Sequence, residues 1–206
     1  MSETIHKIYL SDQLSTVAIE EKKPIGSYLD EQLFSEEREQ LNELSNDFRK
    51  IEYLGVRRLR NETSLPSPIY YSESRKPFLK KDLNTFISIS HSKQYCALGV
   101  SSNELGIDIE EISPRIERIS TRFINSSEER FVSEQKTLDL TKIWTMKEAM
   151  FKLNNRAGIE FKTELIIEEK SGNVYSGKML TENGWKQVKL ECFKLDELVI
   201  SACSYT

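Results

Sequence analysis

The chain has 206 residues, of which 30% are charged and 38% hydrophobic, and its formal net charge is −4. These values are those of an ordinary globular protein, long enough for one large domain or two small lobes. The negative charge gives no indication of nucleic-acid binding. No apolar run approaches the ~18 residues that span a bilayer, and the first residues lack the basic and apolar parts of a signal peptide. We therefore expect a cytoplasmic protein that binds neither nucleic acid nor membrane.

The first half of the chain predicts a strand over 5–10, a long loop, and a charged helical region over 35–62. Ser35 is a suitable N-cap for this region. Three strand-like runs follow, and the short polar turns between them suit adjacent antiparallel strands. These runs are residues 86–90, 95–100 and 105–110.

The second half predicts helices over most of 114–156, followed by a meander of four strands with glycine-containing turns. The four runs are residues 161–168, 174–180, 186–193 and 198–205. The order strand, helices, sheet therefore occurs twice. This order predicts an α+β fold of two similar lobes, 1–103 and 104–206, related by a pseudo-twofold axis. We expect a monomer, with the ligand in the crevice between the lobes.

The three cysteines, Cys96, Cys192 and Cys203, lie far apart in apolar, strand-like segments. Their odd number and the absence of CxxC or Cys/His spacing argue against a disulfide framework and against a zinc site. We expect all three to be reduced core residues.

Two carboxylates alternate with isoleucines at the end of a predicted central strand. Side chains at i and i+2 of a strand share a face, so Asp108 and Glu110 converge while Ile107 and Ile109 point into the core. Such acid-x-acid pairs are common in an acidic chain, with about 5 expected by chance. Their alternation with isoleucines, after a glycine and at the end of a strand that should be buried on one face, is what indicates a functional role.

A second pair of charges lies one turn apart on a predicted helix, where Glu148 and Lys152 share a face next to apolar Trp144. Such a pair is also a routine helix-stabilising contact. If this helix crosses the strand of Asp108 and Glu110, three carboxylates meet, and their repulsion requires a cation between them. Oxygen ligands alone favour Mg²⁺ over zinc.

His91 ends the run Ser88-Ile89-Ser90-His91-Ser92, where a strand turns. Hydroxyl and imidazole donors at such a position suit phosphate oxygens, although the same residues also satisfy the backbone of a turn. A serine hydrolase is not indicated, because the chain has no G-x-S-x-G elbow.

Four blocks in this order resemble the 4′-phosphopantetheinyl transferases, specifically the two-lobed type that acts on acyl and peptidyl carrier proteins. The blocks are Lys76-Pro77-Phe78-Leu79 with the serine–histidine run that ends at Ser92, Gly106 to Glu110, Arg122 to Glu129, and Trp144 to Lys152. The resemblance implies transfer of the phosphopantetheine group of coenzyme A to a carrier serine, with release of adenosine 3′,5′-bisphosphate. It also implies that the N-terminal lobe binds the adenine and 3′-phosphate end of coenzyme A, and that the C-terminal lobe holds the metal and docks the carrier.

The resemblance implies that Asp108, Glu110 and Glu148 bind Mg²⁺, which grips the pyrophosphate of coenzyme A. Glu148 would also accept the proton of the carrier serine, directly or through a water. Lys152 would neutralise the phosphate that leaves. Glu128 is an alternative base, or a residue that positions that water.

On the coenzyme A side, the resemblance implies that His91 and Ser90 contact phosphates and that Lys76 lines the adenine and 3′-phosphate end. Arg49 and Arg58 would hold the 3′-phosphate. Two neighbouring arginines are alternatives for this role: Arg57 and Arg60. Arg75 stands where the family usually has a glycine, which is a departure in the local turn.

Carrier proteins of this kind are usually acidic, so docking on a negatively charged protein requires a local basic patch. The segment 114–123, which carries Arg115, Arg118 and Arg122, is the candidate. Two alternative functions remain at this stage: a coenzyme A-binding sensor without transferase activity, and a Mg²⁺-dependent hydrolase of nucleotide pyrophosphates. The resemblance admits carrier proteins of fatty-acid, polyketide or peptide synthesis.

Overall fold

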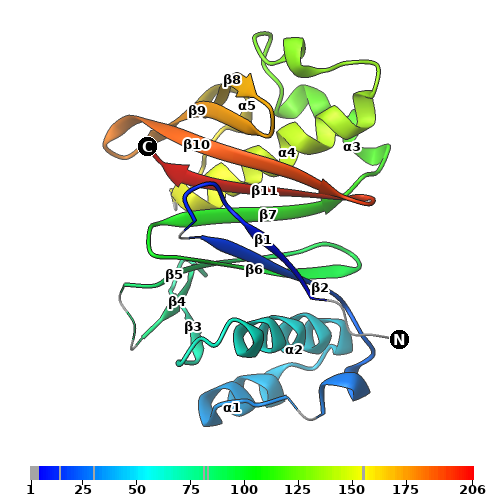
Figure 1. Ribbon diagram of the computed structural model, residues 1–206, viewed down its shortest axis with the longest axis vertical. Helices are drawn as coiled ribbons and strands as arrows, with labels where there is room; N and C mark the ends of the chain where they lie inside the picture. The colour runs from blue at the N-terminus through cyan, green and yellow to red at the C-terminus, as the bar shows by residue number, and fades with distance from the viewer. Residues whose placement is uncertain (1–4, 14, 30, 81, 83, 155) are drawn as a thin grey trace. The chain divides into compact units, whose positions relative to one another are not determined.

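In the computed structural model, the described residues are 5–13, 15–29, 31–80, 82, 84–154 and 156–206. The chain forms two compact units, Met1–Asn103 and Glu104–Thr206. Each unit has its own antiparallel sheet with helices packed on it (Figure 1). The predicted α+β class is therefore confirmed. The main sheets of the two units differ, with four strands in the first and five in the second, and the pseudo-twofold relation of the units stays a prediction.

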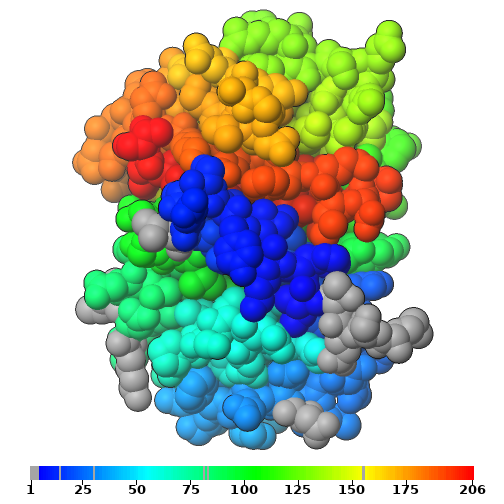
Figure 2. All heavy atoms as spheres, in the orientation of Figure 1, coloured from blue at the N-terminus to red at the C-terminus, as the bar shows by residue number. Residues whose placement is uncertain are grey.

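The sheet of the first unit has the strand order β1-β2-β6-β5, with every neighbouring pair antiparallel. Its strands are β1 (His6–Tyr9), β2 (Thr16–Glu21), β5 (Phe86–His91) and β6 (Tyr95–Ser101). The other elements are η1 (Ile25–Tyr28), α1 (Ser35–Glu43), α2 (Asp47–Glu62) and the hairpin β3 (Ile69–Tyr71) and β4 (Pro77–Leu79). Helix α2 packs against β2 and β6. In the space-filling view, β1, α1 and α2 make up most of the visible surface of this unit (Figure 2).

The charged helical region predicted over 35–62 is confirmed, and it consists of two helices, α1 and α2. Asn46 causes the break, because its side chain accepts hydrogen bonds from the amides of Phe48 (2.8 Å) and Arg49 (3.3 Å) and so caps a new helix. Ser35 is the first residue of α1, and Phe34 takes the N-cap position predicted for Ser35.

The sheet of the second unit has the strand order β7-β11-β10-β9-β8. Its strands are β7 (Leu105–Glu111), β8 (Leu165–Ser171), β9 (Val174–Thr181), β10 (Gly184–Leu195) and β11 (Leu198–Tyr205). Its helices are α3 (Arg115–Ile119), η2 (Ser120–Arg122), η3 (Glu129–Phe131), α4 (Lys136–Asn154) and α5 (Phe161–Glu164). The long helix α4 lies against β7 and β11 (Figure 1) and closes the hydrophobic core of this unit.

The short turn before β7 had predicted that this strand pairs with β6. In the structure β7 pairs instead with β11, the last strand of the chain. In this register Asp108 lies opposite Ser201 and Ile109 opposite Ile200. The turn length before β7 is compatible with a hairpin, yet the complementary apolar strand lies about ninety residues further on, and local spacing carries no information on such a partner.

The three cysteines are buried and free, as predicted. Burial raises the pKa of the Cys96 thiol to about 12 and that of Cys192 to about 11, so neither is a thiolate near neutral pH. Within the described ranges, no helix has the length and apolar character needed to cross a membrane.

Candidate active site

Helix α4 crosses β7 directly over Gly106. A Cβ atom at this position would clash with the carbonyl oxygen of Ala149 and would lie 2.8 Å from the amide nitrogen of Leu153. Only glycine allows this close approach of two backbones. The crossing places the strand residues that follow Gly106 beside the turn of α4 that contains Glu148 and Lys152.

Lys152 reaches across from α4 to the strand, where its Nζ lies 2.8 Å from Oδ1 of Asp108. The Asp108 side chain is almost completely buried, whereas that of Lys152 is 27% exposed. The ammonium therefore sits between the acidic strand and solvent. The predicted proximity of the strand acids to Lys152 is confirmed by this contact.

Glu110 and Glu148 complete the acid cluster, which we define as Asp108, Glu110 and Glu148. Burial, and next the charge of Asp108, raise the pKa of Glu110 to about 7. The same two causes, in the same order, raise the pKa of Glu148 to about 7. Lys152 acts in the opposite direction on both carboxyls. One lysine does not balance three carboxylates, so the cluster retains excess negative potential at neutral pH.

The donor chemistry of the acid cluster fits Mg²⁺, because it offers only carboxylate oxygens in a partly buried, negatively charged position. As they stand, the side chains of the described residues include no group of three or more His, Cys, Asp or Glu in an arrangement that could hold a metal ion. Lys152 already pairs with Asp108, so an ion would have to share this acid with it.

Trp144, one turn before Glu148 on α4, also contacts the cluster. Its indole nitrogen Nε1 donates a hydrogen bond of 3.2 Å to Oε1 of Glu110. The sequence indicated only that Trp144 belongs to an apolar neighbourhood. A hydrogen bond from a ring on a helix to an acid on a strand depends on tertiary contact, and no local pattern reveals it.

Glu128, the alternative base, lies apart from the acid cluster in a fully buried ion pair with Lys147 (2.7 Å). Its two oxygens also accept hydrogen bonds from the amides of Ile167 (2.8 Å) and Asn125 (3.1 Å). A carboxylate held by an ammonium and two amides has no exposed oxygen with which to take a proton from a substrate. The geometry therefore assigns Glu128 a structural role, which removes it as the alternative base.

The residues predicted for coenzyme A lie in the first unit. His91 is exposed at the end of β5, next to buried Ser90, and Lys76 is half-buried immediately before β4. The Arg49 side chain is 70% exposed and lies 3.4 Å from Glu52. These four positions stay predictions as coenzyme A ligands.

Arg58 is a poor candidate for the 3′-phosphate. Its side chain is only 10% exposed and is paired with Glu20 (3.2 Å) and Glu31 (3.4 Å), which neutralise its charge. The alternatives named with it, Arg57 and Arg60, are buried and share the carboxylate of Glu37. The sequence does not distinguish an exposed helical arginine from a buried one in this region, because acidic residues that could pair with a buried arginine are abundant in the neighbouring segments.

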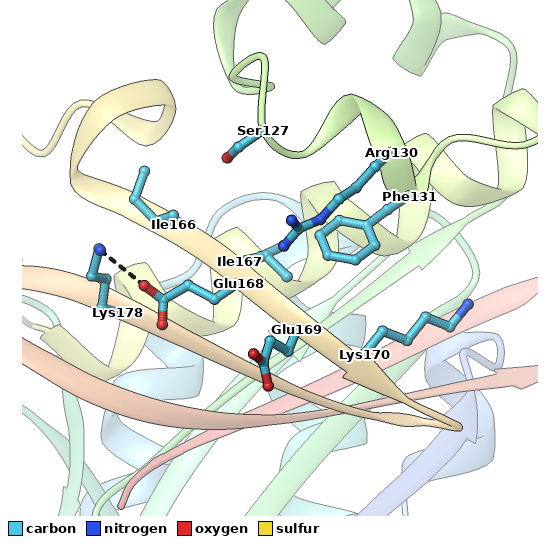
Figure 3. A pocket seen from close by; sticks show the side chains of 9 residues that line it. All are labelled: Ser127, Arg130, Phe131, Ile166, Ile167, Glu168, Glu169, Lys170 and Lys178. Atoms are coloured by element: carbon cyan, nitrogen blue, oxygen red, sulfur yellow. Dashed lines mark ion pairs between the residues drawn. The ribbon is translucent and has the colours of Figure 1, made fainter.

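A cavity of about 910 Å³ in the second unit lies away from the acid cluster (Figure 3). Strand β8 and η3 form its walls, with Arg130 and Phe131 on one side and the ion pair of Glu168 and Lys178 on the other. Neither Trp144 nor a member of the acid cluster lines it.

Residues 104–203 match the family model of the 4′-phosphopantetheinyl transferase superfamily. This stretch contains the whole acid cluster together with Lys152 and Trp144. A comparison with curated proteins finds no match.

Proposed function

Because the chain belongs to the 4′-phosphopantetheinyl transferase superfamily through residues 104–203, we propose that it transfers the 4′-phosphopantetheine group of coenzyme A to a serine of an acyl or peptidyl carrier protein. The serine oxygen forms a bond to the phosphorus that carries the pantetheine. The bond from that phosphorus to the bridging pyrophosphate oxygen breaks, and adenosine 3′,5′-bisphosphate leaves. The observation that carries this proposal is the juxtaposition of Lys152 with the acid cluster.

Asp108, Glu110 and Glu148 would hold Mg²⁺ in this reaction. When bound, the ion would supply positive charge to the pyrophosphate oxygens and lower the barrier to nucleophilic attack. Lys152, which is partly exposed beside Asp108, adds a second positive charge and neutralises the oxygen that leaves. The protein's contribution to such a displacement is chiefly positioning and charge neutralisation.

Glu148 is the proposed general base. A serine hydroxyl is a weak nucleophile until its proton is accepted by a group within hydrogen-bond reach. Burial and the charge of Asp108 raise the pKa of Glu148 to about 7 in the metal-free protein, and a Mg²⁺ ion held by the cluster would favour the deprotonated form that accepts the proton. Glu128 cannot share this role, because Lys147 holds it in the core.

The first unit would bind the remainder of coenzyme A. His91 and Ser90 at the end of β5 would contact phosphate oxygens, and Lys76 and the exposed Arg49 would hold the adenine and 3′-phosphate end. Arg58 is left out of this set, since Glu20 and Glu31 already balance its charge.

The carrier protein would dock on α3 and η2. Arg115, Arg118 and Arg122 are all exposed on these two short helices. They offer a local positive surface to an acidic partner on a chain whose net charge is −4. Ile116, between the first two, is buried and anchors α3 to the core of its unit.

The test is intact-mass spectrometry of an apo acyl carrier protein incubated with this protein, coenzyme A and MgCl₂. We expect a mass gain of one phosphopantetheine group, lost with EDTA and with Glu148→Gln. Glu169→Gln, which neutralises an exposed acid on β8, is the matched control and retains transfer. Absence of transfer across acyl and peptidyl carriers would refute the proposal, and release of phosphopantetheine without a carrier would indicate a hydrolase. The match to a transferase superfamily gives no support to the sensor alternative.

A further inference from the structure

We propose that Trp144 is a positioning residue for Glu110. Its indole N–H donates a hydrogen bond to Oε1 of that carboxylate, which would leave Oε2 available as a ligand to a cation held by the acid cluster. This inference rests on the proposed Mg²⁺ site and extends it to a residue that supplies no ligand atom itself.

The hydrogen bond comes from the same helix face as the proposed base. Trp144 and Glu148 are one turn apart on α4 and therefore neighbours. From this face the Trp144 Nε1 reaches across to Glu110 on β7 at 3.2 Å. A single tryptophan thus connects the two elements that supply the acids of the cluster.

The indole ring is held in place by two other aromatic rings. Phe161 stacks on it with a centroid separation of 5.4 Å and an interplanar angle of 30°, and Phe123 packs at 5.1 Å and 58°. Phe161 in turn packs against Phe151 at 5.6 Å. Rings at these distances attract one another beyond their burial, so the indole has little freedom to turn its N–H away from Glu110.

The buried ammonium of Lys147 fixes the backbone of both flanking phenylalanines. Its Nζ donates hydrogen bonds to the carbonyl oxygens of Phe123 (2.6 Å) and Phe161 (2.9 Å), and its charge is balanced by Glu128. Lys147 thus holds the backbone of the two phenylalanines whose rings pack against the indole. This gives the Lys147–Glu128 pair a consequence at the acid cluster, although neither residue reaches it.

Partners that hold a metal ligand from outside typically change metal affinity about 10–100-fold when they are removed. Trp144 meets this description, since it donates to a ligand oxygen and its own orientation is fixed by packing. A purely structural tryptophan would affect stability but not the affinity of a folded protein for Mg²⁺.

The sharpest test removes the indole N–H and keeps the ring. In the Trp185→Phe variant of this chain, Trp144 is the sole tryptophan, because the 206 residues contain two. Growth with β-(3-benzothienyl)alanine then replaces only this residue by an isostere that has sulfur in place of N–H. Mg²⁺ affinity is measured by calorimetry with MgCl₂ alone. Trp144 emission during the same titration of the Trp185→Phe protein gives an independent reading.

We expect Trp185→Phe to bind Mg²⁺ as the wild type does, since Trp185 is 51% exposed on β10. Binding of Mg²⁺ to this variant should change the emission of Trp144. The isostere should bind Mg²⁺ at least about tenfold more weakly. Trp144→Phe, which also lacks the N–H, should do the same and carries the test if the isostere does not fold.

Equal Mg²⁺ affinity of the isosteric and the Trp185→Phe proteins would overturn the role of Trp144 and leave the proposed metal site intact. If neither the wild type nor Trp185→Phe binds Mg²⁺, the proposed metal site itself fails and the inference with it. Loss of binding in Glu110→Gln alone, with the isostere unaffected, would likewise overturn the role of Trp144.

Discussion

The Lys147 ammonium lies 2.7 Å from Oε2 of Glu128, and both side chains are fully buried, although Lys147 precedes the proposed base Glu148 in the chain. Successive helical residues point about 100° apart, so Lys147 faces the core while Glu148 faces the acid cluster. Two adjacent charged residues of one helix therefore have different roles. Lys147 forms a buried ion pair that stabilises the second unit, and Glu148 belongs to the proposed active site.

Removal of either partner of this buried pair should be costly. Lys147→Met or Glu128→Gln leaves one charge buried without its counter-charge, and we expect each to lower the free energy of unfolding by about 3–5 kcal/mol. Urea unfolding measures this loss. The double variant should lose less than the sum, because no uncompensated charge remains. Single losses below about 1 kcal/mol would contradict the role assigned to the pair.

Gly106→Ala should destabilise the second unit. The added Cβ would meet backbone atoms of Ala149 and Leu153 that cannot move without shifting α4. Overpacking of this kind costs at least about 1–3 kcal/mol, and we also expect weaker Mg²⁺ binding because α4 carries Glu148. Gly26→Ala is the control, since a Cβ there meets nothing within 4 Å. Equal unfolding midpoints for the two variants would disprove the close crossing.

Glu148→Gln should separate activity from stability. Burial and the charge of Asp108 oppose ionisation of this carboxyl, so a neutral amide relieves on the order of 1–3 kcal/mol in the metal-free protein at pH 8. We expect an equal or higher melting temperature together with loss of transfer. Loss of activity accompanied by a lower melting temperature would indicate that Glu148 is structural.

The stability of the metal-free protein should depend on pH through Glu110 and Glu148. Their pKa values are raised from 4.5 to about 7, so between these values the folded state holds protons that the unfolded chain has released. The free energy of unfolding therefore falls as the pH rises through this interval, and these two groups contribute their full stabilisation only below it. Mg²⁺ binds the deprotonated acids, so its stabilising effect should grow over the same interval.

Melting curves at about pH 6 and pH 8, each with EDTA and with MgCl₂, test this linkage. The increase in melting temperature on addition of MgCl₂ should be larger at the higher pH. An increase that is equal at both values would show that the two carboxyls are not the groups that the ion requires.

Arg118→Glu should raise KM for the carrier protein and leave the affinity for coenzyme A unchanged. The side chain is exposed on α3, and reversal of its charge repels an acidic partner without touching the acid cluster. Arg130→Glu is a matched reversal at the cavity beside β8 and should have no such effect. Steady-state kinetics with a carrier protein, together with calorimetry for coenzyme A, distinguish the two effects. Reduced coenzyme A binding in Arg118→Glu would refute the docking assignment.

The sequence was most informative where charged residues follow the repeat of a strand or a helix, because the repeat then predicts which of them share a face. Alternation of acids with isoleucines predicted that Ile107 and Ile109 are buried, which they are. The one-turn spacing predicted that Glu148 and Lys152 share a helix face, and the contact of Lys152 with Asp108 shows that this face meets the strand. The partner of β7 could not be predicted, because pairing with β11 is decided by packing between distant segments. The same limit applies to Arg58, whose carboxylate partners come from elements outside its own helix.

Strand β8 is an edge strand of the second sheet, and its pairing with β9 is irregular between Ile167 and Glu169. Glu128 accepts the amide hydrogen of Ile167 (2.8 Å), and the exposed part of the strand carries charged residues. An edge with a bulge, charges and a covered amide resists the addition of a strand from a second molecule. A variant that lacks this acceptor, such as Glu128→Ala, would leave the Ile167 amide unpaired at the sheet edge, so aggregation during refolding should accompany its loss of stability.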